Sequence, residues 1–332
     1  MSKKLHTIKI HATFKGQGVV NFGCSDDKFM LNKSMGATVV SHDNTKIAKA
    51  SYAINNDGSI ARTLKVSSQC LRQGIYKQMH NPNIIHSPAL FNDYASSKAG
   101  LMSGYMFASE KKGAAKRKSP LTVIDAHETS GAVPTFNVHS NSGDRNDTSL
   151  YYVEEVGQTR FETDMFINLS ELQFIPLSDT YGRNSVFPDG EEPFKSALRT
   201  KYGNIEEGYY AIEGEEGQVP EYGVKLPGSA VCDIVKDFIG HLKKFRVDRA
   251  NSYLEFDSTE FFIFENGTWV RVDEPVDFTV NSRYVLVEDQ VAAKNLHDDV
   301  CVQAKEEQAA RKAAKNEEKA KKAAKKAEKK AN

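Results

Sequence analysis

One short segment holds the side chains whose types and spacing best suit the binding of an anion. A basic extended stretch leads into Ser67-Ser68-Gln69, and a helix follows that carries Arg72 and Lys77. A serine at a helix start accepts a hydrogen bond from one backbone N–H group, and the remaining N–H groups form an anion site with the helix dipole. Gln69 and Arg72 are three residues apart and share one helix face. The segment predicts a phosphate-binding helix start. A capped helix with solvated charges is the alternative.

Further basic residues lie on or beside the elements that flank this turn. Charge-assisted hydrogen bonds to phosphate are worth about 1.5–3 kcal/mol each, so several of them would outweigh any single base contact. The pattern favours RNA binding along the backbone, independent of base sequence. The candidate contacts in this region are Lys46, Lys49, Arg62, Lys65, Ser67, Ser68, Gln69, Arg72 and Lys77.

The composition is that of a chain that can bury a core. Its 332 residues, 39% of them hydrophobic, suffice for one large or two ordinary domains. No run reaches the ~18–20 apolar residues of a membrane-spanning helix, and residues 1–6 lack the apolar core of a signal peptide. Four cysteines, far apart and without a Cys-x-x-Cys pair, argue against a zinc site and a disulfide framework. We expect a cytoplasmic protein without a cofactor or a metal.

A net charge of zero hides an asymmetry along the chain. Residues 1–150 contain 19 Lys and Arg and 10 Asp and Glu, residues 151–302 contain 14 and 29, and residues 303–332 contain 11 and 5. A basic half suits an anionic partner. An acidic half could keep nucleic acid away, or meet the basic half of the next copy head to tail. The alternative is that the two halves of the sequence do not form separate faces.

Apolar periodicity predicts an α+β fold. Thr7–Phe14 alternates between apolar and polar residues, as in a half-buried strand, and residues 227–242 have the spacing of an amphipathic helix. Asn55–Gly58 and Asn266-Gly267 predict hairpin turns. The other elements expected are strands over 37–41, 47–54, 60–66, 121–126, 160–169, 253–256, 261–264, 269–272 and 284–287 (the last closing the sheet), helices after Ser67 and over 88–103, and a loop over 23–36.

Residues of about 105–160 are predicted to leave the sheet as an excursion. Residues 109–118 form a basic stretch that we expect to be flexible, and residues 135–139 and 149–153 can pair as a long projecting hairpin. Aromatic side chains on such a hairpin suit stacking against unstacked bases. A β-meander within the domain is the alternative. The RNA-binding candidates in this excursion are Lys116, Arg117, Lys118, Phe136, Val138 and His139.

The remaining segments are interpreted as additions to one domain. Residues of about 180–228 are rich in glycine, proline and glutamate, which predicts a loop-rich acidic insertion without a core of its own. Residues 303–332 are almost entirely Ala, Lys, Glu, Arg and Gln with no apolar stripe, so a solvated helix or a disordered basic tail is expected. We therefore predict a single domain over residues 1–302 and a low-complexity tail.

A strand that feeds Ser67-Ser68-Gln69 and then a basic helix resembles the guide-RNA-binding backbone subunit of CRISPR type I Cascade complexes, nearest to a variant or minimal type I-F system. The resemblance implies an RRM-like, or ferredoxin-like, antiparallel sheet with helices on one face and a projecting hairpin called the thumb. It also implies that Gln69 and Arg72 lie against the guide RNA backbone. Many relatives have another basic residue one helical turn after Arg72, whereas this chain has Tyr76 and then Lys77.

The same resemblance implies a scaffold and not an enzyme. Several copies would line up head to tail on one CRISPR RNA, other Cascade subunits would cap the guide ends, and the guide would pair with target DNA. Base pairing then reads the sequence, while the protein reads the backbone. Cleavage is expected of another protein.

Two further functions remain as alternatives. Asp26 or Asp27 could catalyse target-RNA cleavage, as an aspartate in a comparable loop does in RNA-targeting relatives, although the glycine-rich surroundings of that loop are largely missing here. A general single-stranded nucleic-acid-binding protein is the other alternative. Asp125, His127 and Glu128 could hold a metal, or could simply mark the end of a surface strand.

Overall fold

The computed structural model describes most of the chain up to residue 307. The described residues are 3–18, 21–36, 38, 45–79, 90–109, 113–131, 135–141, 150–187, 190–215, 217–249, 252–275, 277–303 and 306–307. Among them, no helix is both long enough and apolar enough to cross a membrane. The strand expected over 37–41 and nearly all of the basic tail lie outside the described residues.

A large antiparallel sheet forms the centre of the molecule. The first predicted strand is present in it, and its residues Ile8, Ile10, Ala12 and Phe14 are fully buried. In space the strands follow the order β16 (Arg246–Arg249), β17 (Ser252–Glu265), β2 (Thr7–Gln17), β12 (Gln158–Asn168), β9 (Ala126–Glu128), β5 (Ile60–Val66) and β4 (Ala50–Ile54), with β18 (Thr268–Val272) beside β17 and β8 (Leu121–Val123) beside β12.

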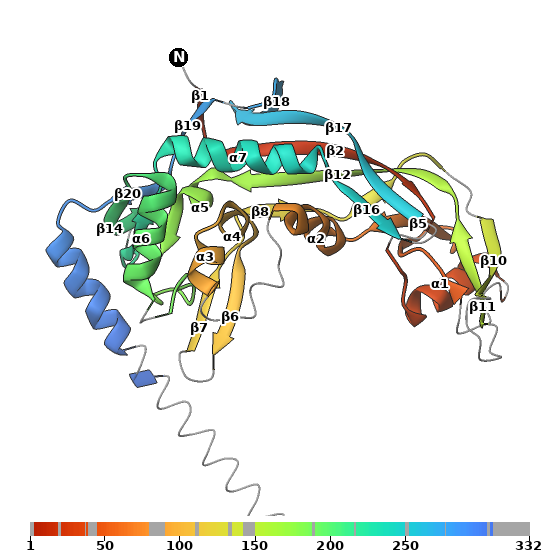
Figure 1. Ribbon diagram of the computed structural model, residues 1–332, viewed down its shortest axis with the longest axis horizontal. Coiled ribbons are helices and arrows are strands. Elements are labelled where there is room, and N and C mark those ends of the chain that lie inside the picture. Colours follow the sequence, from red (N-terminus) through yellow and green to blue (C-terminus); the bar gives the residue numbers. More distant parts are fainter. Residues whose placement is uncertain are drawn as a thin grey trace, which may run out of the picture.

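The connections between these strands are those of a ferredoxin-like fold. The strands β17, β2, β12 and β9 are neighbours in that order, and all their pairings are antiparallel. In the chain, α2 (Ser68–Met79) lies between β2 and β9, and α7 (Gly228–Leu242) connects β12 to β17. This is the β-α-β-β-α-β arrangement, so the predicted fold class is confirmed. Figure 1 shows α2, α4 (Lys98–Ser103) and α7 together along the sheet.

The elements with the clearest apolar patterns or turn residues in the sequence are present in the structure. Every apolar residue of the stripe predicted for α7 is fully buried, and β5 and α2 begin and end close to their predicted bounds. Gly58 and Gly267 both have φ near +80°, so the two predicted hairpin turns form where glycine tolerates that conformation. The two strands predicted over 253–264 are one strand, β17, with an irregularity between Phe256 and Ser258.

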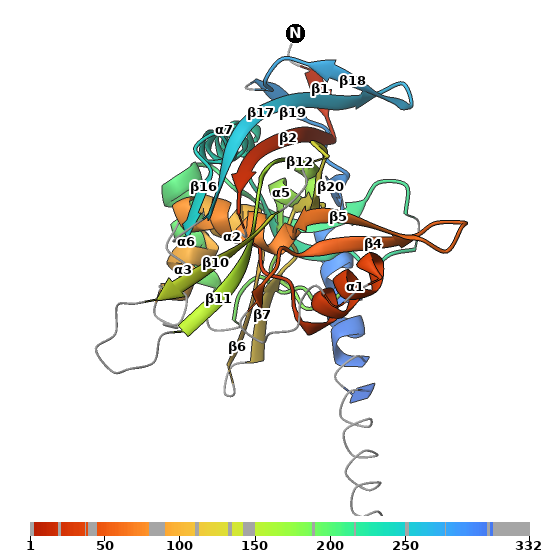
Figure 2. The same ribbon diagram turned by 90° about the vertical axis from the view of Figure 1, so that its right-hand side faces the viewer.

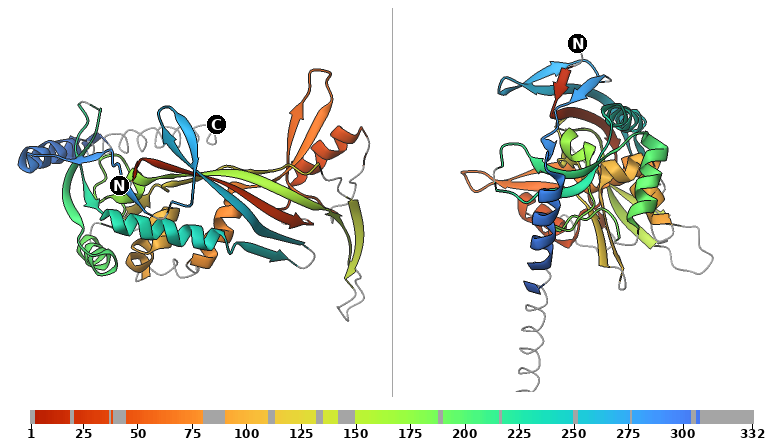
Figure 3. Two further views of the ribbon diagram at one scale, coloured as in Figure 1. Left: turned by 90° about the horizontal axis from the view of Figure 1, so that it is seen from above. Right: turned by 90° about the vertical axis from the view of Figure 1, so that its left-hand side faces the viewer.

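A second, smaller sheet projects from one end of the molecule (Figures 1 and 3). The strands β10 (Thr135–Asn141) and β11 (Leu150–Val156) pair in antiparallel fashion, which confirms the predicted hairpin. β3 (Thr45–Lys46) adds to β11 in parallel. At the same end, α1 (Ser25–Met35) packs against β5, so the loop predicted over 23–36 is wrong. The signal for α1 is in its ends and not in an apolar stripe, because Asp27 caps its start and Gly36 ends it with φ 63°.

Residues 105–160 do not form one continuous excursion. β6 (Tyr105–Ser109) and β7 (Gly113–Arg117) make a two-stranded ribbon of their own, so the flexible stretch predicted here is wrong. β8 and β9 then return to the central sheet before β10 leaves it again. Arg117 is only 4% exposed, and its guanidinium donates to the carbonyl oxygens of Leu101, Glu171, Leu172 and Phe174. A buried arginine cannot be recognised from its neighbours in sequence.

The opposite end carries a sheet where the sequence predicts loops. β13 (Phe174–Pro176), β15 (Glu221–Lys225), β14 (Glu206–Ile212) and β20 (Tyr284–Leu286) pair in that order, with α6 (Glu191–Tyr202) beside them (Figure 1). Phe174, Tyr210 and Tyr284 form a small core, with the rings of Phe174 and Tyr284 stacked at 4.2 Å. The prediction of a loop-rich insertion is therefore wrong, because this segment forms α6, β14 and β15 and buries side chains in the main core, and β20 closes this sheet, not the central one.

Several shorter elements complete the described structure. The helix predicted over 88–103 is broken into α3 (Phe91–Ala95) and α4, and Ser97 Oγ caps α4 by accepting from Gly100 N. β1 (Lys3–Leu5) pairs with β19 (Phe278–Val280), and α5 (Leu169–Gln173) follows β12 directly. Residues 290–303 are helical and lead toward the C-terminal tail.

Candidate nucleic-acid interface

The start of α2 is closed by a carboxylate from a distant part of the chain. Ser67 Oγ accepts from Cys70 N at 3.4 Å, as expected of a capping serine. The N–H group of Ser68 donates to Asp125 Oδ1 at 2.8 Å, and Lys65 Nζ lies 3.2 Å from Asp125 Oδ2. Partial burial would raise the pKa of Asp125, but these contacts hold the pKa below its ordinary value. A carboxylate therefore lies where the sequence predicts open donors for an anion.

Gln69 and Arg72 have different surroundings, although they share a helix face. Gln69 is exposed. Arg72 is half-buried, and its guanidinium donates to Ser103 O at 2.7 Å and to Leu121 O at 3.2 Å. Arg72 thus fastens α2 to α4 and β8, whereas Gln69 presents its amide to solvent.

One helical turn after Arg72, one residue packs against the protein and the next is exposed to solvent. The hydroxyl of Tyr76 donates to Met102 O at 3.3 Å, and its ring centroid lies 5.7 Å from the Arg72 guanidinium. Burial raises the pKa of Tyr76 well above its usual range, so the hydroxyl stays protonated. Lys77 is exposed. Where many relatives have a cation, this chain therefore has a packing tyrosine, and the cation follows one residue later.

Arg62 has its counter-ion inside the protein. Its Nη1 and Nη2 donate to the two carboxylate oxygens of Glu155 at 2.6 and 2.9 Å, and Glu155 is only 2% exposed. The same carboxylate accepts from Ala48 N at 2.7 Å. Because Arg62 lies on β5 and Glu155 on β11, this pair anchors the projecting hairpin to the central sheet.

Two cations lie against the ring of an exposed phenylalanine beside α2. The ring of Phe22 is 39% exposed, with Lys46 Nζ 5.9 Å and the Arg249 guanidinium 4.6 Å from its centroid. Asn21 Oδ1 accepts from Ser67 N at 3.0 Å, which ties this turn to the start of α2. Sequence reasoning missed Phe22 and Arg249, since they are far apart in the chain and neither belongs to a motif.

The other predicted contacts are spread over the molecule. The side chains of Lys116 and Lys118 are exposed around the β6–β7 ribbon, whereas Arg117 is buried. Phe136 is 36% exposed on β10. Val138 and His139 pair with Val153 and Tyr152 in β11, but their side chains lie outside the described residues. The contacts nearest to one another are those around the start of α2, which include Lys46, Lys49, Lys65 and Gln69, whereas Lys77 lies in the last turn of α2.

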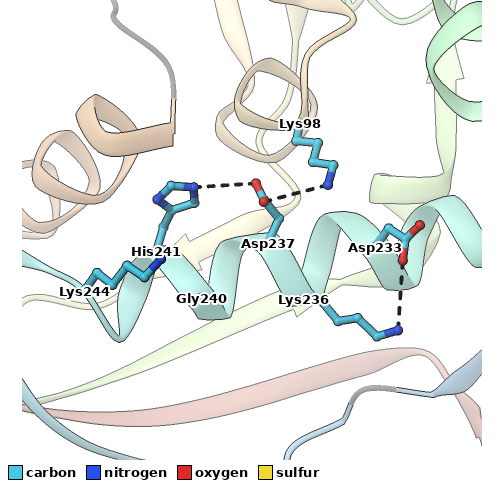
Figure 4. Close-up of a pocket in the computed structure, with 7 residues that line it drawn as sticks. All are labelled: Lys98, Asp233, Lys236, Asp237, Gly240, His241 and Lys244. Carbon is cyan, nitrogen blue, oxygen red and sulfur yellow. Dashed lines mark ion pairs between the residues drawn. The ribbon is translucent and has the colours of Figure 1, made fainter.

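The exposed side of α7 carries a shallow pocket of mixed charge (Figure 4). Asp237 lies between Lys98 and His241 at 3.7 and 3.8 Å, and Lys236 is 3.9 Å from Asp233. Gly240 and Lys244 complete the lining of the pocket. Ion pairs of this length between solvated side chains contribute little to stability. Two of the three lysines that line the pocket are paired with its two aspartates, so most of its charge is compensated locally.

Two of the aspartates considered above for catalysis or metal binding, Asp27 and Asp125, accept hydrogen bonds from the protein itself. Asp27 Oδ2 accepts from Cys24 N at 2.8 Å and caps α1, while Asp26 is exposed on the same helix and not in a loop. Asp125 contacts Ser68 and Lys65, as described above. In the part of the chain that the structure describes, no group of three or more His, Cys, Asp or Glu is arranged to hold a metal ion.

Comparison with known proteins identifies the family. The model of the family described as type I-Fv CRISPR-associated protein Cas7fv-like matches residues 4–283. The chain belongs to this Cas7fv-like family. The match confirms the resemblance inferred from the Ser67-Ser68-Gln69 helix, and it gives the variant type I-F subtype.

Solved structures that resemble this Cas7fv-like chain do so at low identity. One, described as "CRISPR RNA-guided surveillance complex", has 11% identity and a TM-score of 0.36 and covers 90% of this chain and 84% of its own. A second, described as "CRISPR RNA-guided surveillance complex, pre-nicking", has 10% identity and a TM-score of 0.38 and covers 90% and 89%. No curated protein sequence matches the chain.

Proposed function

We propose that this Cas7fv-like protein is the scaffold that binds the CRISPR RNA along its backbone, independent of sequence. Several copies line up head to tail on one guide, other Cascade subunits cap its ends, and the guide is presented for pairing with target DNA. The hairpin β10–β11 serves as the thumb, with Phe136 near the bound strand. The chain itself cleaves nothing.

The observation that supports this proposal most strongly is family membership over residues 4–283. The distribution of cations agrees with it. Lys46 and Gln69 near the start of α2 and Lys77 in its last turn are exposed side chains that can reach a phosphate or a ribose. Contacts of these groups to the RNA backbone carry no sequence information. A guide of variable sequence requires this kind of binding.

The elongated arrangement of the elements is compatible with head-to-tail assembly. The strands β14 and β15 and helix α6 lie at one end, and α1 and the β10–β11 hairpin lie at the other (Figure 1). The two halves of the sequence mix in the central sheet, where β2 lies between β12 and β17, so the charge difference along the chain does not divide the molecule into an acidic and a basic end. The two ends are built from different elements, so one end of a copy can meet the other end of the next copy.

Binding to two single-stranded RNAs of equal length and unrelated sequence tests the proposal. Fluorescence anisotropy at low salt should give the same affinity for both, and the RNAs should stay intact in the presence of Mg²⁺. A strong preference for one sequence would contradict backbone binding. Regularly spaced, metal-dependent cuts that disappear in Asp26→Asn or Asp27→Asn would show that the protein is an endonuclease.

A further inference from the structure

A cleft of about 500 Å³ lies between α2 and β16, next to the motif but on another face of the helix. Gln73 and Lys77 line it from α2, and Arg246 and Arg249 line it from β16. Figures 1 and 2 show the two elements side by side. Gly74 makes the close approach possible, because a Cβ there would lie 2.4 Å from Cε2 of Phe245. The cleft is therefore built by close packing of the helix on the segment that enters β16.

The charges that line this cleft leave a positive excess. Arg246 Nε lies 3.0 and 2.9 Å from the two carboxylate oxygens of Asp248, and Arg246 Nη1 donates to Glu255, so two carboxylates neutralise this arginine. Among the described residues, neither Lys77 nor Arg249 has a carboxylate within ion-pairing distance. Burial raises the pKa of the Cys70 thiol, so Cys70 adds no negative charge to the cleft at neutral pH. Two cations thus face the cleft without a counter-ion from the described protein.

Phe22 fixes the direction of one of these cations. The Arg249 guanidinium lies 4.6 Å from the centroid of the Phe22 ring, a distance typical of a cation–π contact. The hydrogen bond from Ser67 N to Asn21 Oδ1 holds the adjacent residue against the start of α2. Arg249 is nevertheless exposed. An arginine held over an aromatic ring loses less side-chain freedom when it binds phosphate, so Arg249 is partly pre-organised for this role.

We infer that the cleft between α2 and β16 binds phosphate groups of single-stranded RNA, with Arg249 and Lys77 as ligands and Phe22 as the positioning residue. The inference rests on the proposed function and extends it to residues outside the motif. The guide would then pass from Gln69 along α2 to the cleft beside β16. A protein partner suits the cleft less well, because its lining lacks the large aromatic anchors of protein interfaces.

The test measures the affinity of the full-length chain for a fluorescein-labelled oligouridine RNA as a function of salt. Arg249→Gln should weaken binding about tenfold, the loss expected for one charge-assisted contact. It should also reduce the slope of log K against log salt by about 0.7, the value for one phosphate of a single strand. Phe22→Leu keeps the charge, so it should weaken binding about two- to fivefold with an unchanged slope.

Arg271→Gln is the matched control. Arg271 is exposed on β18 and pairs with Glu260 at 2.9 Å, remote from the cleft, so its removal should leave affinity and slope as they are. Lys77→Gln repeats the test from the other wall of the cleft, in case Arg249→Gln fails to fold. Thermal unfolding by circular dichroism compares the folding of all variants.

The outcomes separate this inference from the proposed function. If the wild-type chain binds RNA but Arg249→Gln and Lys77→Gln behave like Arg271→Gln, the cleft is not a phosphate site, although the function stands. A loss of affinity with an unchanged slope in both variants also overturns the inference. So does normal RNA affinity combined with loss of larger particles, which would make the cleft a protein contact. A wild-type chain that binds no RNA overturns both.

Discussion

The α6–β14 end of the molecule and the surroundings of α2 both contain many cations, but the cations of the first region are paired with carboxylates of the protein and several of the second are not. At the end formed by α6 and β14, Lys195 Nζ lies 3.1 Å from Glu191 and 2.8 Å from Glu207, and Arg183 lies 2.6 Å from Glu221. Around α2, by contrast, Lys77 and Arg249 have no carboxylate partner among the described residues. Basic residues mark a site for an anionic partner only where the fold does not supply the counter-ion itself.

Arg62 shows that paired and unpaired cations are not simply separated between these two regions. It belongs by sequence to the cations around α2, yet Glu155 neutralises it completely inside the protein. The pair holds the projecting hairpin to the sheet. We call a cation closed when a carboxylate of the protein neutralises it, and open when no described carboxylate does. Breaking a closed pair should therefore affect folding, whereas removing an open cation should affect RNA binding.

The largest expected effect comes from opening the pair between Arg62 and Glu155. Glu155→Ala leaves a nearly buried guanidinium without a counter-ion and takes the acceptor from Ala48 N, so the free energy of unfolding should fall by about 3–5 kcal/mol. Urea denaturation measures it. The matched control is Glu260→Ala, which opens an exposed pair and should cost about 0–1 kcal/mol. Equal losses in the two variants would contradict the distinction between closed and exposed pairs.

A second experiment compares an open cation with a closed one directly. Lys77→Gln should weaken RNA binding about tenfold and leave the urea midpoint unchanged, because Lys77 is exposed and has no carboxylate partner in the described structure. Lys195→Gln should do the reverse, since it removes the buried cation that Glu191, Glu192 and Glu207 share, although Glu207 keeps Arg199. Anisotropy measures the RNA affinity of both variants, and urea denaturation measures their unfolding midpoints. Loss of RNA binding in Lys195→Gln alone would reverse the comparison.

The smallest expected effect tests the carboxylate at the start of α2. Asp125→Asn keeps an oxygen that accepts from Ser68 N but removes a negative charge and releases Lys65. RNA binding should strengthen by about threefold, because like charge near the bound backbone is removed. Weaker binding would show that Asp125 organises the site and does not oppose it.

The same variant should change the dependence of stability on acid. The pKa of Asp125 is lowered from its ordinary value of 3.8 in the folded protein. The stability that this carboxylate contributes is therefore complete above about pH 4 and is lost as the pH falls through the lower folded value. Asp125→Asn should reduce the loss of stability below pH 4, as measured by urea denaturation at a series of pH values.

Much of the fold was predictable because its central elements follow regular patterns. The stripe of α7, the alternation of β2 and the glycine turn at Gly267 each depend on residues close in sequence. The elements that were missed lack such patterns. In α1 the signal lies in the caps, and Leu31 is the only apolar residue of that helix that is buried. In β7 a buried arginine, Arg117, occupies a core position.

The candidate site was less predictable than the fold. The motif identified the family and located α2, but the role of each side chain depends on residues distant in the chain. Asp125 closes the helix start, Glu155 neutralises Arg62, and Phe22 positions Arg249. Each of these contacts is created by the packing of the sheet, so spacing within a motif cannot show it.

The nucleic-acid content and size of the purified protein test the central claim most directly. Absorbance at two wavelengths and light scattering, at low and high salt and with and without RNase, give both quantities. The proposed scaffold should purify as RNA-containing particles of several copies that become smaller when RNase is added. An RNA-free monomer that also fails to bind added guide RNA at low salt would contradict the claim.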